Sequence, residues 1–284
     1  MMAWYHSVKQ PEAVTRPRLE LSGPVIGKGF SSLLAKAEES LGIDAYLSAL
    51  KLKSELFTEL LEINRLEQLN EKSFLAICTF MSTVRRRIGI WLDNNPFSLL
   101  QDRLLMLLDT REPGEQRFEH FVASFPADRT LRWVRDLAAE ILHFTEPEKI
   151  PLMTRWIWDA QTGSGVLNEI WFEQAIPLDT LALDDRPATF FALNSELEEF
   201  LGTHGIYRDR VWMQDLLCAH LYAAYINDRG AAYLKSEFTG DVDPMAHTRR
   251  LLGLDCFRED GIHMKVKLPS RLSAGSIPPP QLTA

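Results

Sequence analysis

The chain has 284 residues, of which 46% are hydrophobic, and its formal net charge is −8. This composition excludes an intrinsically disordered protein, because disordered chains have too few apolar side chains to form a core. The negative charge argues against nucleic-acid binding through phosphate neutralisation, which needs a basic footprint. No run approaches the roughly 20 apolar residues that a membrane span requires, so we expect no membrane partner.

The cysteines and the N-terminal residues favour the cytoplasm. Cys78, Cys218 and Cys256 are far apart, form no CxxC pair and stand in apolar surroundings, as is typical of reduced, buried thiols. The first residues lack the continuous apolar segment of a secretory signal. We therefore expect a cytoplasmic protein.

Residues 1–27 are rich in proline and glycine without periodicity, which predicts a flexible arm. A helical domain is expected over residues 28–176, with Ser31 or Ser32 capping its first helix. Between Ile43 and Trp91, apolar residues recur every three or four positions, and glycine, proline and asparagine separate the later periods. No alternating strand pattern interrupts them. The fold class predicted is mainly α, as an antiparallel multi-helix array or bundle.

The stretch from residue 131 to residue 176 holds four of the seven tryptophans. We expect one helix through Trp156 and Trp158 and a second helix from Val166 to Ala175. On a helix these two tryptophans would lie about 200° apart. Trp156 shares a face with Leu152 and Met153 and should point into the core. Trp158 adjoins a polar turn and should point outward, within an aromatic surface.

The turn Thr162–Gly163–Ser164–Gly165 has two interpretations. Free backbone amides before a helix could hold a phosphate or a carboxylate. The alternative is a tight connection between two antiparallel helices. Together with its neighbours, this turn forms the predicted binding site, which consists of Trp158, Asp159, Thr162, Gly163, Ser164, Gly165 and Trp171.

Glu140 and His143 form a Glu-x-x-His spacing, which puts a carboxylate and an imidazole on one helix face. Di-iron proteins use this spacing, but they need a second such motif and two further glutamates. The chain shows only one such pair in a predicted helix. Glu140 and His143 are therefore weak metal candidates, with an ordinary ion-paired role as the alternative, and we expect no metal and no cofactor.

Residues 177–187 contain two prolines and no helical period, which predicts a linker. A C-terminal helical subdomain, packed on the first, should cover residues 188–268. Its longest helix is apolar nearly all round from Val211 to Ile226 and should be broken near Asn227–Gly230. A small β-hairpin is expected between Asp255 and Lys267, and residues 269–284 should form a disordered tail.

Two hypotheses for function remain. The first is an interaction or accessory protein that binds another protein through the aromatic surface of residues 151–176. The second is a helical enzyme or cofactor-binding protein with a pocket near His143, Trp156, Trp158 and the Gly163–Gly165 loop. We favour the first because no catalytic motif is legible, and we leave catalysis and homo-oligomerisation open.

Overall fold

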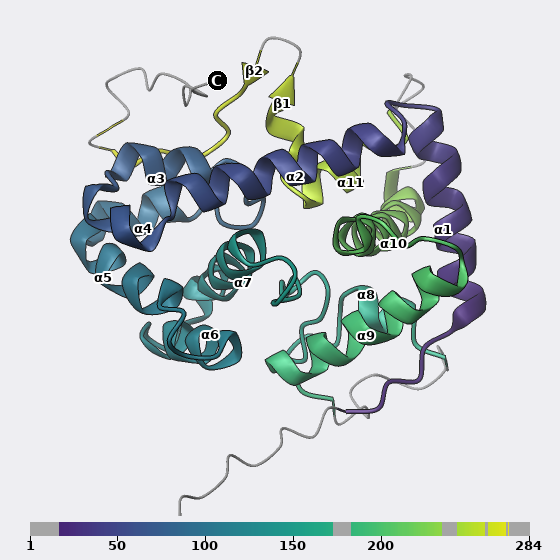
Figure 1. Cartoon of the computed structure of the whole chain (residues 1–284). Coiled ribbons are helices and arrows are strands. Elements are labelled where there is room, and N and C mark those ends of the chain that lie inside the picture. The colour runs from purple at the N-terminus through teal and green to yellow at the C-terminus, as the bar shows by residue number, and fades with distance from the viewer. Residues whose placement is uncertain (1–16, 173–182, 235–242, 259–260, 271, 273–284) are drawn as a thin grey trace, which may run out of the picture.

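The computed structural model describes residues 17–172, 183–234, 243–258, 261–270 and 272. The fold is mainly α, which confirms the predicted class (Figure 1). Its α-helices are α1 (Gly23–Glu38), α2 (Ile43–Leu60), α3 (Glu71–Cys78), α4 (Ile88–Asn94), α5 (Phe97–Leu108), α6 (Gly114–Ala123), α7 (Trp133–Thr145), α8 (Val166–Glu169), α9 (Pro187–Thr203), α10 (Arg210–Leu234) and α11 (Ala246–Leu251). Short 3-10 helices cover Ile63–Gln68, Arg129–Leu131 and Leu254–Cys256.

The C-terminal hairpin is also present, as β1 (Phe257–Arg258) and β2 (Gly261–Ile262). The two strands are antiparallel, with Phe257 opposite Ile262 and Arg258 opposite Gly261. The hairpin stands at one edge of the molecule, beyond α2 and α11 (Figure 1). It is the small β element that the sequence predicts near the C-terminus.

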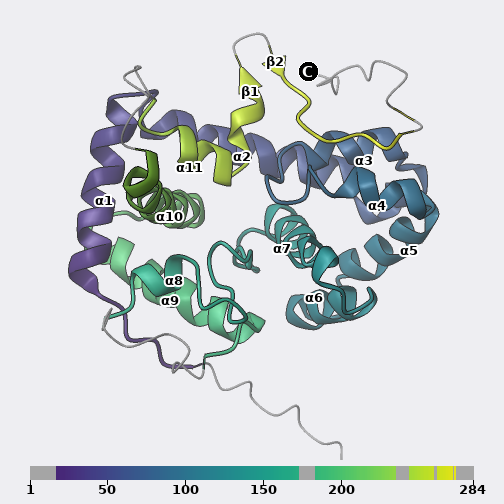
Figure 2. The same cartoon turned by 180° about the vertical axis from the view of Figure 1, so that it is seen from behind.

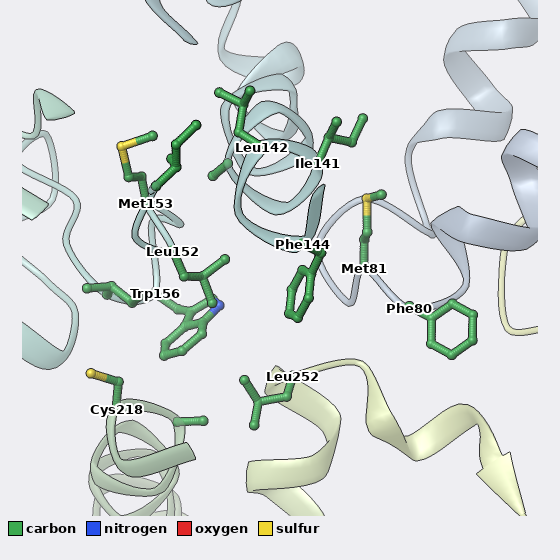
Figure 3. Close-up of a cluster of buried hydrophobic side chains, with 14 of the residues drawn as sticks. Phe80, Met81, Ile141, Leu142, Phe144, Leu152, Met153, Trp156, Cys218 and Leu252 are labelled. Carbon is green, nitrogen blue, oxygen red and sulfur yellow. The ribbon is translucent and has the colours of Figure 1, made fainter. Parts of the chain in front are cut away.

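Helix α2 spans the molecule. Helices α3 to α7 gather at one end of it, and α1 with α8 to α10 gather at the other, as both views show (Figures 1 and 2). α2 packs against α7 and also against α10. The apolar side chains form one continuous core. Its central part joins Phe80 and Met81 of the α3–α4 connection, Ile141, Leu142 and Phe144 of α7, Trp156, and Leu252 after α11 (Figure 3).

Lys53, in the middle of α2, is fully buried in this core. Its Nζ donates hydrogen bonds to Glu140 Oε2 at 2.6 Å, to the Phe80 carbonyl at 3.0 Å and to the Leu252 carbonyl at 2.9 Å. An ammonium group has three donors, so all of them are used. The Nζ also lies 3.8 Å from the centre of the Phe144 ring, a favourable cation–π contact. One side chain thus joins α2 to α7, to the α3–α4 connection and to the end of α11.

Gly253 allows the end of α11 to reach the Phe80 backbone. Its φ is +72°, and a Cβ at this position would lie 1.7 Å from the Phe80 carbonyl oxygen. Only glycine fits both this left-handed conformation and this contact. Gly253 therefore allows the Leu252 carbonyl to lie next to the Phe80 carbonyl, so that both accept from Lys53.

Some predicted helix bounds are wrong. α1 begins at Gly23, not at Ser31 or Ser32, because Pro24 suits the first turn and its missing N–H costs nothing there. α10 continues through Asn227–Gly230, since one glycine in a helix costs only about 1 kcal/mol. The segment 151–158 is not helical. Its amides bond to other groups, among them the Arg155 amide, which donates to the Asp136 carboxylate.

Several predictions fall on residues outside the described ranges. Residues 1–16 of the predicted arm, residues 173–182 around the predicted linker, and most of the predicted tail are among them. The predicted helix from Val166 to Ala175 is described only as far as residue 172. Within that range the helix α8 ends at Glu169. The division of the chain into domains stays a prediction.

We expect Lys53→Met to lower the free energy of unfolding by roughly 3 to 5 kcal/mol, because Glu140 would remain buried without its counter-charge. Burial already raises the pKa of Glu140, and Lys53 offsets part of that rise. Without Lys53 the carboxyl should take up a proton more readily, so the loss should be smaller at pH 5 than at pH 8. Urea unfolding at the two pH values measures this.

Lys51→Met is the matched control on the same helix. Lys51 is half-exposed and pairs with Asp209 at the surface, so its loss should cost less than about 1 kcal/mol. Equal losses for the two lysine variants would contradict the role of Lys53 in the core.

Candidate functional site

The predicted aromatic surface is not formed by the tryptophans. Trp156, Trp158 and Trp171 are all buried, and Trp158 is only 1% exposed. The Trp158 indole N–H donates to the Asp184 carbonyl at 3.1 Å. The outward orientation predicted for Trp158 is therefore wrong. The reason is that residues 151–158 do not form a helix, so the separation of about 200° between the two rings does not arise.

Trp171 is covered by the chain segment before α1. Leu21 and Trp171 form an antiparallel bridge. Beside it, the Ser22 amide donates to the Ile170 carbonyl at 2.7 Å, and the Phe172 amide donates to the Glu20 carbonyl at 2.9 Å. The side chain of Phe172, in contrast, is 64% exposed.

The Thr162–Gly165 turn uses two of its four amides for hydrogen bonds within the fold. The amides of Thr162 and Ser164 both donate to the Asp159 carbonyl, and the Val166 amide donates to the Trp156 carbonyl. Gly165 has φ +128°, and a Cβ there would lie 2.5 Å from the Ile157 carbonyl oxygen. This geometry is that of a tight connection. The helix that follows, α8, has four residues and presents no extended N-terminus to an anion.

Glu140 and His143 are buried in α7, and each is bonded to a partner. Glu140 accepts from Lys53, as described above. The His143 Nδ1–H donates to the Ile150 carbonyl at 2.8 Å, and Nε2 lies 2.8 Å from Asp215 Oδ2 on α10. Both ring nitrogens are therefore occupied. Within the described ranges, no group of three histidine, cysteine, aspartate or glutamate residues is placed to hold a metal ion.

The environment of His143 favours the charged imidazole. Burial by itself lowers the pKa of this ring, but the charge and the hydrogen bond of Asp215 outweigh burial, so the pKa is raised above its usual value. The pair is then an imidazolium and a carboxylate that join α7 to α10. The Glu-x-x-His spacing thus serves two buried ion pairs, one to α2 and one to α10.

A cleft opens beside the predicted site, between the end of α6, the start of α7 and the Arg155–Gln161 segment. Its volume is about 530 Å³. The apolar residues that line it include Val122, Phe125 and Val134. The charged side chains that line it are Arg129, Arg132, Arg135, Arg155, Asp128, Asp159 and Asp185.

Ion pairs hold most of the arginines of this cleft in place. Arg132 pairs with Asp159, the one predicted site residue that lines the cleft. Arg135 pairs with Asp185 at 3.0 Å. Arg155 binds the fully buried Asp136 through Nε at 3.0 Å and through a terminal nitrogen at 2.6 Å. These contacts fix the guanidinium groups on a rigid frame, which lowers the entropic cost of binding a ligand.

Donor capacity remains after these pairs are made. The Nε–H of Arg135 is buried without a hydrogen-bond partner among the described residues. Arg129 is exposed and makes no ion pair with another described residue. Buried donors without partners are rare in folded proteins, and an absent ligand or water is one explanation for them.

The sequence interpretation missed these arginines, although a signal was present. Arg129, Arg132 and Arg135 recur at three-residue spacing, which places them near one face of a helical turn. Arg155 gave no such signal, because its place in the cleft depends on a fold contact with Asp136.

Comparisons with protein-family models, with curated proteins and with solved structures found no match. Among the described helices, none combines the length and the apolar character that crossing a membrane requires.

Trp158→Ala and Trp156→Ala should each destabilise the fold by roughly 3 to 5 kcal/mol, because both rings are core side chains. Thermal or urea unfolding of the two variants measures the losses. Tyr207→Ala is the control, since Tyr207 is 73% exposed and should cost less than about 1 kcal/mol. A Trp158→Ala protein as stable as the parent would restore the outward orientation.

The His143 pair should stabilise the fold in a pH-dependent way. Because the folded pKa lies above the unfolded value of about 6.5, its contribution should be fully present below pH 6.5 and lost as pH rises through the folded pKa. His143→Gln should therefore cost more stability at pH 6 than at pH 9, measured by urea unfolding. The exposed His247→Gln serves as control. A cost for His143→Gln that does not change with pH would contradict the imidazolium assignment.

Proposed function

We propose that this protein binds a small organic anion with an apolar body in the arginine cleft. The observation that supports this most is the cleft itself, which is lined by guanidinium groups and by apolar side chains. Its volume of about 530 Å³ falls in the range of small-molecule sites. A carboxylate or phosphate would take the free guanidinium donors, and the apolar body would cover Val122, Phe125 and Val134.

A binding role has more support than a catalytic one. Asp159 and Asp185 each hold an arginine, and Asp128, the third carboxylate of the cleft, accepts the Thr130 amide at 2.8 Å. A general base needs a free lone pair within reach of the proton that it removes. No nucleophile paired with a base lines this cleft in the described part of the chain. Catalysis therefore remains the weaker alternative.

The accessory role through another protein stays a proposal, together with a cytoplasmic location. Three buried free thiols are compatible with a reducing compartment. If a protein partner binds at residues 151–176, the exposed residues in the described part of this segment are Ala160, Gln161, Thr162 and Phe172, since the tryptophans are covered. Anion binding in the neighbouring cleft has the better support, because a hollow with fixed cations is present.

Titration calorimetry with phenyl phosphate, benzoate and the neutral benzamide tests the proposal on the full chain. The two anions should bind, and benzamide should bind at least about tenfold more weakly, because it lacks the charge that the guanidinium groups recognise. Arg129→Gln should weaken anion binding about fivefold without loss of stability, since Arg129 forms no ion pair with another described residue.

Arg111→Gln is the matched control for this experiment. Arg111 is an exposed arginine that pairs with Asp109 before α6, away from the cleft. Its variant should bind the anions like the parent protein. Equal binding of benzoate and benzamide, or no binding of either anion at millimolar concentration, would overturn the proposal.

A further inference from the structure

A second hollow lies between α11 and the C-terminal hairpin, well apart in the sequence from the arginine cleft. Its volume is about 490 Å³. The cationic side chains that line it are Arg249, Arg250, Arg258 and Lys265, and His247 lies beside them. Asp255 is the one carboxylate that lines it among the described residues. This strong positive character is unexpected in a chain whose net charge is −8.

The carboxylates near this hollow are already engaged. Asp255 accepts from Arg85 through both oxygens, at 2.8 and 2.9 Å, and from Lys265 Nζ at 2.8 Å. Asp243 pairs with Arg249. Glu259 and Asp260 join the two strands and lie outside the described residues. A positive excess therefore remains among the described groups. The two carboxylates are Asp243 and Asp255, and the five cations are Arg85, Arg249, Arg250, Arg258 and Lys265.

The excess positive charge lies on guanidinium groups whose N–H donors are not all used in hydrogen bonds. Arg250 and Arg258 are exposed, and neither forms an ion pair with another described residue. The Nε–H of Arg249 is buried and has no hydrogen-bond partner in that part of the chain. Cations that line one hollow repel one another, and a bound anion would offset this repulsion.

The frame of the hollow is anchored to the core. The Lys265 amide donates to Thr79 Oγ1 at 2.8 Å, and the Lys267 amide donates to the Arg85 carbonyl at 2.6 Å. At the other side, the end of α11 is fixed by the contact of Gly253 with Phe80 and by the Leu252 carbonyl on Lys53. The backbone of both walls is therefore anchored to the core, and the ion pairs with Asp243 and Asp255 hold the Arg249 and Lys265 side chains.

We propose that this hollow is a binding site for a phosphate chain, as found in a nucleoside triphosphate or in inorganic tripolyphosphate. Guanidinium forks match phosphate oxygens in pairs, and several adjacent forks favour several adjacent negative charges over a single carboxylate. The site is one confined hollow on an acidic protein. The basic residues that line it are few, and a duplex or a long single strand needs a basic face that continues beyond one hollow.

Titration calorimetry with tripolyphosphate and ATP, in the presence of a chelator that removes divalent cations, tests the proposal on the full chain. Both should bind, adenosine should not, and affinity should fall between 50 and 300 mM salt because the contacts are ionic and partly exposed. ATP and tripolyphosphate of equal affinity would assign the site to the phosphate chain alone. A tighter ATP complex would add a contact to the nucleoside.

Arg250→Gln and Arg258→Gln should each weaken tripolyphosphate binding about five- to tenfold, and the double variant should weaken it further. Both residues are exposed and break no described ion pair, so the melting temperature should change little. Arg111→Gln and the cleft variant Arg129→Gln are controls that should bind tripolyphosphate like the parent. Because the two sites use different arginines, either proposal can fail without the other.

Two results would overturn the proposal. The first is that tripolyphosphate does not bind, or that it binds Arg250→Gln and Arg258→Gln as tightly as the parent protein. The other is a single-stranded RNA that binds more tightly than tripolyphosphate and depends on the same arginines, which would make the hollow part of a nucleic-acid surface.

Discussion

The buried ammonium group of Lys53 constrains the structure more than any other single group. Removing it from water costs several kcal/mol, and only close acceptors can offset that cost. Glu140, the Phe80 carbonyl and the Leu252 carbonyl supply them, from α7, from the α3–α4 connection and from the end of α11. All of these segments must be in place together. The Lys53 contacts thus select one arrangement around a core that apolar packing alone would specify less strictly.

Local physics made the helices predictable. Apolar residues every three or four positions, separated by glycine, proline and asparagine, correctly indicate a mainly α fold and a C-terminal hairpin. The same reasoning fails between residues 151 and 158, because the Asp136 carboxylate takes the Arg155 amide there and the helix does not form. The error at Trp158 follows from that failure. Pattern reasoning cannot anticipate a hydrogen bond between residues 19 positions apart.

The partners of Lys53 and the arginine cleft could not be predicted for a related reason, since both depend on residues far apart in the sequence. Lys53 shares a helix face with Leu50 and Phe57, so its place on the apolar side was readable from spacing. Its partners were not readable, since Glu140 lies 87 positions away. Likewise, Arg129, Arg132 and Arg135 show a helical spacing, but the cleft exists only once Arg155 and Asp159 are brought against them. The predicted surface lay next to the cleft and contributed Asp159 to it.

A double-mutant cycle on Lys53 and Glu140 tests the central claim most directly. Unfolding free energies of Lys53→Met, Glu140→Leu and the double variant would be measured by urea denaturation at pH 7. If the two groups form one buried unit, the double variant should be at least about 2 kcal/mol more stable than the sum of the single losses predicts. Losses that add to within about 0.5 kcal/mol would contradict the account.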